Sequence, residues 1–112
     1  MADGTTALVT QVHDEGDATR VALSGKLTTM TAPGLDELLE GLPFDRDVAL
    51  DLSQLDYMAS AGLRTIIASG KRAAAAGVGF YLLDPTPEVM EILDMTGLAD
   101  VLDIRHGAGA GA

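Results

Sequence analysis

The sequence contains no cysteine and no tryptophan, and its 112 residues include only two phenylalanines and two tyrosines. Without cysteine, disulfide bonds, thiol catalysis and cysteine-ligated zinc are excluded, which fits a reducing compartment. Because the hydrophobic fraction is nevertheless 47%, the core must be built mostly from aliphatic side chains. The length fits one domain with one core, which we expect to span residues 1–112.

Basic residues are also scarce. Seven lysines and arginines stand against 17 acidic residues, for a formal net charge of −10. Such a charge repels phosphate backbones and anionic headgroups, so the electrostatic basis of nucleic-acid binding is missing. The balance favours a protein partner with a basic face.

Long apolar runs are absent too. No run approaches the roughly 20 residues of a membrane span. The first residues, "MADGTTALVTQV", lack the basic region and apolar core of a signal peptide. We therefore expect a cytoplasmic protein with no membrane insertion.

The usual catalytic and ligand-binding motifs are missing as well. His13 and His106 lie far apart in the sequence, and no HExxH or similar cluster suggests a metal site. Ser60 lacks the GxSxG setting of a hydrolase nucleophile, and the glycines form no phosphate-binding loop. We expect neither enzymatic activity nor a cofactor.

Short strand-like runs alternate with amphipathic runs of helical length. Two alternating runs flank a polar turn near the N-terminus, which predicts an antiparallel hairpin. After Asp47 the segment 47–52 is a near-continuous apolar run broken by one acid, Asp51, as in a strand covered by helices. We expect strands at 7–12, 20–25, 47–52, 78–84 and 100–105, and helices within 31–42, 60–77 and 86–97.

The predicted order is β-β-α-β-α-β-α-β, which indicates a single α/β domain. Strand-helix-strand connections require parallel neighbours, so the sheet should be mixed and mostly parallel, with about five strands and three main helices. We expect an ordered core over about 6–105 and a disordered tail at 106–112. In the helix at 60–77, the predicted buried stripe contains Leu63, Ile66, Ile67, Gly70 and Ala74.

Ser60 stands where a predicted strand meets a predicted helix. Serine is a preferred helix N-cap, so one interpretation is purely structural. Its neighbours Ala59, Ala61 and Gly62 are all small, however, and leave the hydroxyl approachable. A phosphate at this position would meet free N–H groups and the positive end of the helix. The two interpretations do not exclude each other.

The segments "DVALDLSQLDYMASAGLRTII" and "PEVMEILDMTGLADVLDI" resemble the STAS domain family, specifically the single-domain bacterial anti-sigma factor antagonists. "VALSGKLT" is similar to the second strand and following loop of that family, and "MTGL" to its C-terminal signature. The resemblance covers nearly the whole chain. It implies that Ser60 is the phosphorylatable serine, with Gly62 and Leu63 matching the residues that follow it. Ala59 and Thr28 stand where the antagonists commonly have acids.

The resemblance further implies a non-enzymatic switch protein. Its unphosphorylated form would bind an anti-sigma factor, itself a serine kinase with a histidine-kinase-like ATPase fold, and so release a sigma factor; a phosphatase would reset the switch. The predicted contact surface consists of a loop at 26–30, a loop at 56–62 and the exposed side of the following helix. Its residues are Lys26, Thr28, Thr29, Met30, Asp56, Tyr57, Met58, Ala59, Ala61, Gly62 and Arg64. The alternative is a constitutive STAS subunit that scaffolds a stressosome-like or lipid-transport assembly.

Overall fold

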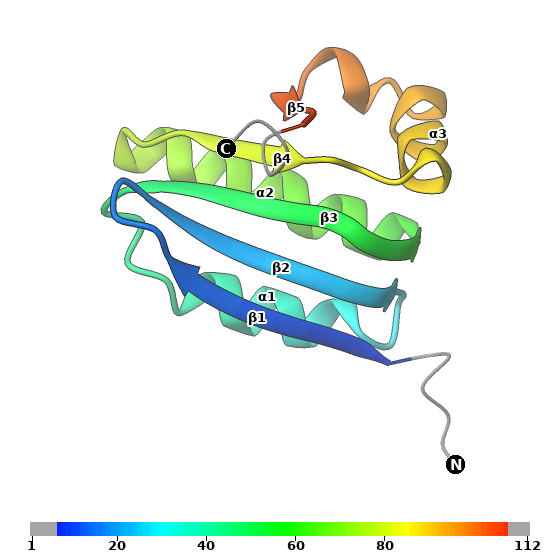
Figure 1. The fold of residues 1–112 in the computed structure, drawn as a ribbon, viewed down its shortest axis with the longest axis horizontal. Helices are drawn as coiled ribbons and strands as arrows, with labels where there is room; N and C mark the ends of the chain where they lie inside the picture. The colour runs from blue at the N-terminus through cyan, green and yellow to red at the C-terminus, as the bar shows by residue number, and fades with distance from the viewer. Residues whose placement is uncertain (1–6, 108–112) are drawn as a thin grey trace.

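A five-stranded sheet with strand order β1-β2-β3-β4-β5 forms the centre of the molecule (Figure 1). The structure is a computed structural model and describes residues 7–107. β1 and β2 pair antiparallel, and every other neighbouring pair is parallel, which confirms the predicted mixed α/β sheet with an N-terminal hairpin. The elements are β1 Leu8–Asp14, β2 Ala18–Leu27, α1 Ala32–Glu40, β3 Asp47–Met58, α2 Ser60–Ala76, β4 Phe80–Leu83, α3 Pro87–Met95, the 3-10 helix η2 Leu98–Asp100 and β5 Ile104–Arg105.

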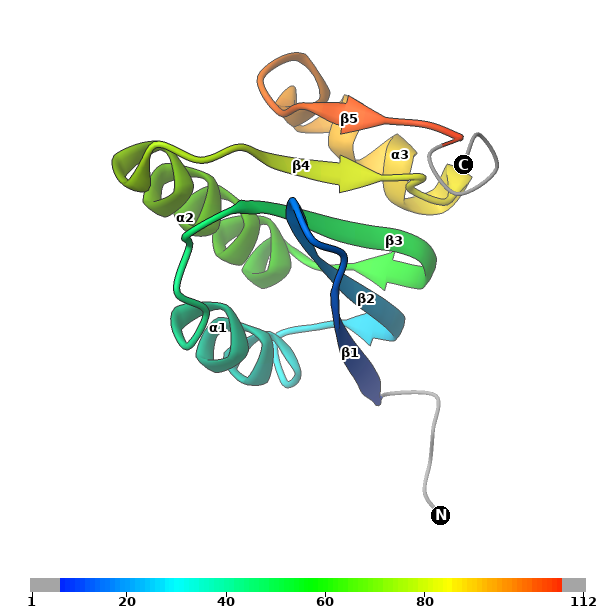
Figure 2. The same cartoon turned by 60° about the vertical axis from the view of Figure 1, so that its left-hand side comes forward.

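The helices share one hydrophobic core on one face of the sheet. Each crossover connects neighbouring parallel strands in the same direction, and right-handed crossovers carry their helices to the same face. Figure 2 shows α1 and α2 together on that side. Leu35 from α1, Ile66 from α2 and Leu93 from α3 are fully buried in the same cluster. The core is aliphatic, as predicted, and the one buried aromatic ring, Phe44, lies in a separate small cluster.

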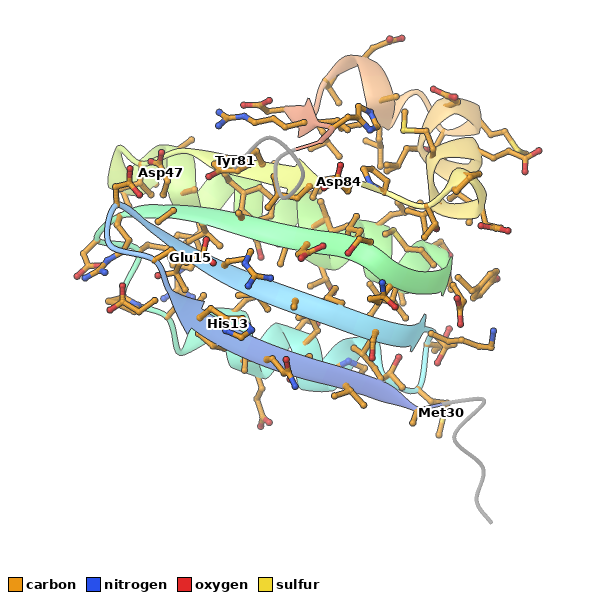
Figure 3. The ribbon with its side chains drawn as sticks, in the orientation of Figure 1. His13, Glu15, Met30, Asp47, Tyr81 and Asp84 are labelled. Atoms are coloured by element: carbon orange, nitrogen blue, oxygen red, sulfur yellow. The ribbon has the colours of Figure 1, made fainter. Side chains whose placement is uncertain are left out.

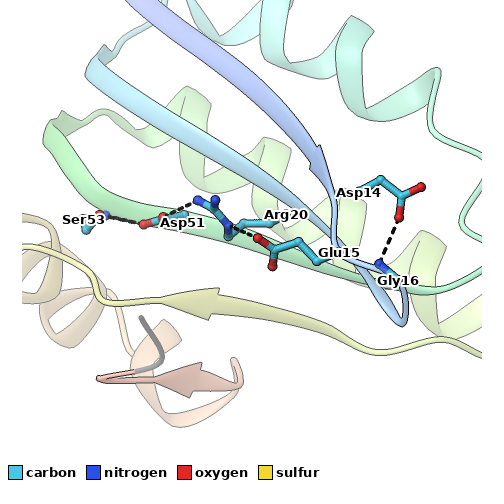
Figure 4. Close-up of polar contacts among 6 residues, drawn as sticks. All are labelled: Asp14, Glu15, Gly16, Arg20, Asp51 and Ser53. Carbon is cyan, nitrogen blue, oxygen red and sulfur yellow. Dashed lines mark hydrogen bonds and ion pairs between the residues drawn. The ribbon is translucent and has the colours of Figure 1, made fainter. Parts of the chain in front are cut away.

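The opposite face of the sheet carries polar side chains. Arg20 bridges two carboxylates there, with its Nε 2.8 Å from Glu15 Oε2 and its Nη1 2.9 Å from Asp51 Oδ2 (Figure 4). The Ser53 hydroxyl donates to Asp51 Oδ1 at 2.7 Å. Asp51 is therefore tolerated in the apolar run of β3 because its side chain lies on this face and is paired.

Strand β3 is longer than predicted. The apolar run that predicts this strand ends at Leu52, but the strand continues to Met58. Leu52, Leu55 and Met58 are all buried although they are three residues apart. The β2–β3 register shifts twice along this segment, and each shift lets the strand skip one position of the alternation. Sequence periodicity of two cannot detect such a strand.

The predicted last strand at 100–105 is shorter than expected. Residues Leu98–Asp100 form η2 behind Gly97, whose φ of 79° is the left-handed region that favours glycine. Val101 is 73% exposed, and only Ile104–Arg105 pairs with β4. The apolar pattern of 100–105 therefore covers the turn that follows η2 and the short strand β5.

Both ends of the chain lie partly beyond the described part. Residue 6 of the expected core and residues 108–112 of the expected tail are outside it. Of the tail, the structure describes His106 and Gly107, and the N–H of Gly107 donates to the carboxylate of Asp84. Within residues 7–107, no helix has the length and apolar character needed to cross a bilayer.

Candidate functional site

The carboxyl ends of β2 and β3 lie side by side and position the candidate site. In the parallel register Lys26 pairs with Tyr57 and Leu27 with Met58. The N–H of Ala59 donates to the Leu27 carbonyl at 2.8 Å, which extends this pairing to the residue before α2. The structure thus brings together the two predicted segments, 26–30 and 56–62. Tyr57 and Met58 belong to β3, however, so the second segment is mostly strand and helix instead of a loop.

The connection from β2 to α1 is held by two threonine hydroxyls. The N–H of Thr28 donates to Thr31 Oγ1 at 2.8 Å, and Thr31 Oγ1 donates to the Lys26 carbonyl at 2.9 Å. Thr28 Oγ1 accepts from the N–H of Met30 at 3.1 Å. With its backbone fixed in this way, the loop presents the Met30 side chain, which is 86% exposed, at the edge of the sheet (Figure 3).

Ser60 is the first residue of α2 and its side chain is exposed. The N-cap position belongs to Ala59, which cannot accept a side-chain hydrogen bond, so the capping interpretation of Ser60 is wrong by one position. The Ala59 carbonyl accepts from the N–H groups of Gly62 and Leu63, at 2.9 and 3.2 Å. Within residues 7–107, the N–H groups of Ser60 and Ala61 have no hydrogen-bond acceptor. A free hydroxyl and two free amides therefore share the first turn.

Gly62 seats the start of α2 against the sheet. A Cβ at this position would lie 2.5 Å from Leu27 Cδ2 and 3.1 Å from Met58 Cγ. Both neighbouring side chains are buried, at 0% and 1% exposed. Only glycine allows α2 to approach the sheet this closely, and the approach fixes where Ser60 emerges.

The predicted contact residues divide by exposure. Met58 and Gly62 are buried, so they support the surface from below and do not line it. Lys26, Thr28, Ala59 and Ala61 are half-buried. The exposed members are Thr29, Met30, Asp56, Tyr57 and Arg64, with Tyr57 46% exposed. The accessible predicted contacts therefore include two large apolar side chains, one acid and one base.

The buried stripe of α2 differs from the predicted one. Ala73 is buried and Ala74 is exposed, and Thr65 and Ser69 are buried as well. The difference arises because α2 packs against α1 as well as against the sheet, which widens its buried face.

Between α1 and α2 lies a hollow of about 500 Å³ that sequence reasoning missed. It begins beside Ser60, at Thr29 and Ala61, and is lined farther along by Asp36, Glu40 and Arg64. The sequence feature that could have indicated this hollow is the amphipathic pattern of α1. Asp36 and Glu40 are four residues apart there and flank the leucine stripe.

A charged network that lowers the pKa of Asp14 lies at the opposite end of the sheet from Ser60. At the β1–β2 hairpin the N–H of Gly16 and the Arg46 guanidinium hold the pKa of the Asp14 carboxyl below its usual value. Arg46 Nη1 is 2.7 Å from Asp14 Oδ1. Among residues 7–107, no three histidine, aspartate or glutamate side chains gather in a way that could hold a metal ion.

The class of protein follows from comparison with known families. The model of the family described as "Mlab, STAS domain" matches residues 10–104, and the chain belongs to the STAS domain family. The match begins within β1 and ends within β5, so it includes part of every strand and all three helices.

The more specific likenesses are to named antagonists. An anti-sigma-B factor antagonist of Staphylococcus epidermidis is 29% identical over 100 residues, which cover 88% of this chain and 91% of that protein. The crystal structure of an anti-sigma factor antagonist from Mycobacterium paratuberculosis superposes with a TM-score of 0.80 at 24% identity, over 89% of this chain and 86% of that one. The unphosphorylated form of the antagonist SpoIIAA gives a TM-score of 0.76 at 17% identity, over 88% and 87%. These structures share the fold described above.

Proposed function

We propose that this protein is an anti-sigma factor antagonist switched by phosphorylation of Ser60. In this proposal the unmodified form binds an anti-sigma factor, a serine kinase with a histidine-kinase-like ATPase fold, and thereby releases a sigma factor. The kinase ends the binding by phosphorylating Ser60, a phosphatase restores it, and the antagonist itself catalyses nothing. The names of the curated relatives support the partner class. The observation that carries the switch is the exposed Ser60 side chain at the first position of α2, directly after the paired carboxyl ends of β2 and β3.

The physical effect of the modification follows from this position. A phosphate adds about −1.5 to −2 charges at neutral pH. The free amides of Ser60 and Ala61 and the positive end of α2 would hold the group on the antagonist. In a complex formed around Met30 and Tyr57, the same group would have to lose its hydration against apolar surface. Phosphorylation is therefore tolerated by the fold and unfavourable for the complex.

Binding of purified anti-sigma factor to Ser60→Ala and Ser60→Asp tests the switch by calorimetry. We expect the alanine variant to bind like the native protein and the aspartate variant to bind at least about tenfold more weakly, equivalent to about 1.4 kcal/mol. Gln11→Glu is the matched control, because it adds one charge at an exposed position of β1 outside this surface. Equal binding by Ser60→Asp and Gln11→Glu would refute the switch. Phosphosite mapping after incubation with the kinase should place the phosphate at Ser60.

A second candidate function is a constitutive STAS subunit of a stressosome-like or lipid-transport assembly. Ala59 and Thr28 favour it, since they replace acids that are common in the antagonists. In the structure the Thr28 hydroxyl is occupied by the N–H of Met30 within its own loop. Affinity purification that recovers scaffold or transporter subunits, together with an unphosphorylated Ser60, would support this candidate over the switch.

A further inference from the structure

A continuous cleft runs along the outer side of the helical layer, between α1 and α2. The hollow beside Ser60 has a volume of about 500 Å³, and a second hollow of about 160 Å³ follows it along the helices. Asp36, Glu40 and Ala68 line both hollows, so the two form one cleft. Its mouth is at Thr29 and Ala61, next to the proposed phosphorylation site.

The two walls of the cleft carry opposite charges. Asp36 and Glu40 project from α1, while Arg64 and Arg72 project from α2. None of these four side chains forms an ion pair with another residue of the described range 7–107. Because these side chains have no ion-pair partner among the described residues, a segment lying in the cleft can pair with either wall.

The floor of the cleft contains a buried hydroxyl without a partner. Ser69 is 6% exposed and lines the second hollow. Within residues 7–107 its hydroxyl makes no hydrogen bond, whereas the hydroxyl of Thr65, one turn earlier, donates to the Ala61 carbonyl at 3.2 Å. A buried polar group without a partner is unfavourable, so the Ser69 hydroxyl is available to a polar group that enters the cleft.

We propose that this cleft binds a polypeptide segment of the anti-sigma factor, which places a basic side chain against Asp36 and Glu40 and a polar group at Ser69. The inference rests on the proposed function and adds a second contact region to the surface around Ser60. Charge selects this occupant, because a protein of net charge −10 attracts a basic partner and the acidic wall offers it a defined position. Arg64 pairs with an acidic group of the same segment on the opposite wall.

Two charge reversals on the same helix test the proposal. Glu40 and Glu37 are both exposed on α1, but only Glu40 lines the cleft. Calorimetry with the purified anti-sigma factor at physiological salt, where exposed charges beyond about 8 Å are screened, should show at least tenfold weaker binding for Glu40→Lys. Glu37→Lys should change the affinity less than threefold. Far-UV circular dichroism establishes that both variants are folded.

A further variant tests the floor of the cleft. Ser69→Ala removes the hydroxyl and keeps the helix, and we expect it to weaken binding several-fold. Equal affinities of Glu40→Lys and Glu37→Lys would overturn the cleft proposal even if Ser60→Asp abolishes binding, and the phosphorylation switch would then stand alone. Failure of the native protein to bind any serine-kinase anti-sigma factor would overturn the proposed function, and this occupant of the cleft with it.

Discussion

Gly62→Ala and Gly70→Ala make the same chemical change in α2 and should have different effects on stability. In a helix interior alanine is favoured over glycine by up to about 1 kcal/mol. At Gly70 the added Cβ would lie 3.6 Å from Phe80 Cδ2, an ordinary van der Waals contact. Gly70→Ala should therefore raise the free energy of unfolding by about 0.5–1 kcal/mol.

At Gly62 the same methyl group would lie 2.5 Å from Leu27 Cδ2 and 2.6 Å from its Cγ. Leu27 is fully buried and cannot move aside into solvent, so α2 must shift away from the sheet. Overpacking of this kind costs about 1–3 kcal/mol, which exceeds or cancels the gain in helix propensity. The net effect of Gly62→Ala should be a loss of about 0–2 kcal/mol.

Urea denaturation followed by far-UV circular dichroism measures both variants. The two free energies of unfolding should differ by about 1–3 kcal/mol in favour of Gly70→Ala. In thermal melts about 1 kcal/mol corresponds to a shift of roughly 4–8 °C for a domain near 100 residues. If Gly62→Ala stabilised the protein as much as Gly70→Ala, the close approach of α2 to β2 that positions Ser60 would be refuted.

Three further variants probe the helix cap, the contact surface and the hairpin. Thr86→Ala removes the N-cap of α3 and a 2.8 Å hydrogen bond to the Leu55 carbonyl, so the free energy of unfolding should fall by about 1–2 kcal/mol; an unchanged urea midpoint would contradict this. Met30→Ser should leave the melting temperature within about 3 °C, because the side chain is 86% exposed, yet weaken anti-sigma factor binding; loss of stability with normal binding would contradict its role. Asp14 has a lowered pKa in the folded state, so its contribution to stability is present above the unfolded value, near 3.8, and is lost as the pH falls through the folded value. Asp14→Asn should therefore flatten the fall of melting temperature below about pH 4, and an unchanged acid profile would contradict the stabilisation of the Asp14 carboxylate by the Gly16 N–H and Arg46.

The class of fold was accessible from local pattern because each element carries its own signal. Thr86 and Pro87 mark the start of α3, and Gly77 ends α2 in the left-handed conformation with a φ of 78°. The alternation of strands and helices then requires a mostly parallel sheet, whatever the details of packing. For the same reason, the place of Ser60 at the start of the second helix was predictable.

Element boundaries that depend on pairing were less accessible. The extension of β3 to Met58 follows from two shifts in register against β2, and these exist only when the two strands lie together. The sequence pattern also assigned Ser60 to the N-cap position. In the structure Ala59 occupies that position, because its backbone is extended and its N–H donates to the Leu27 carbonyl, so α2 begins at Ser60. One hydrogen bond between neighbouring segments decides that position.

Residue order alone thus specified an acidic α/β domain with an aliphatic core and a serine at a strand-to-helix junction, because charge, hydrophobic period and turn residues are local properties. Tertiary structure decided which residues near that serine are accessible. Met58 and Gly62 are buried by α2 packing on the sheet, while Asp36 and Glu40 line a hollow next to the start of α2 from positions 20 or more residues before Ser60 in the chain. Contacts between distant segments set both outcomes, and no periodicity within one segment records them.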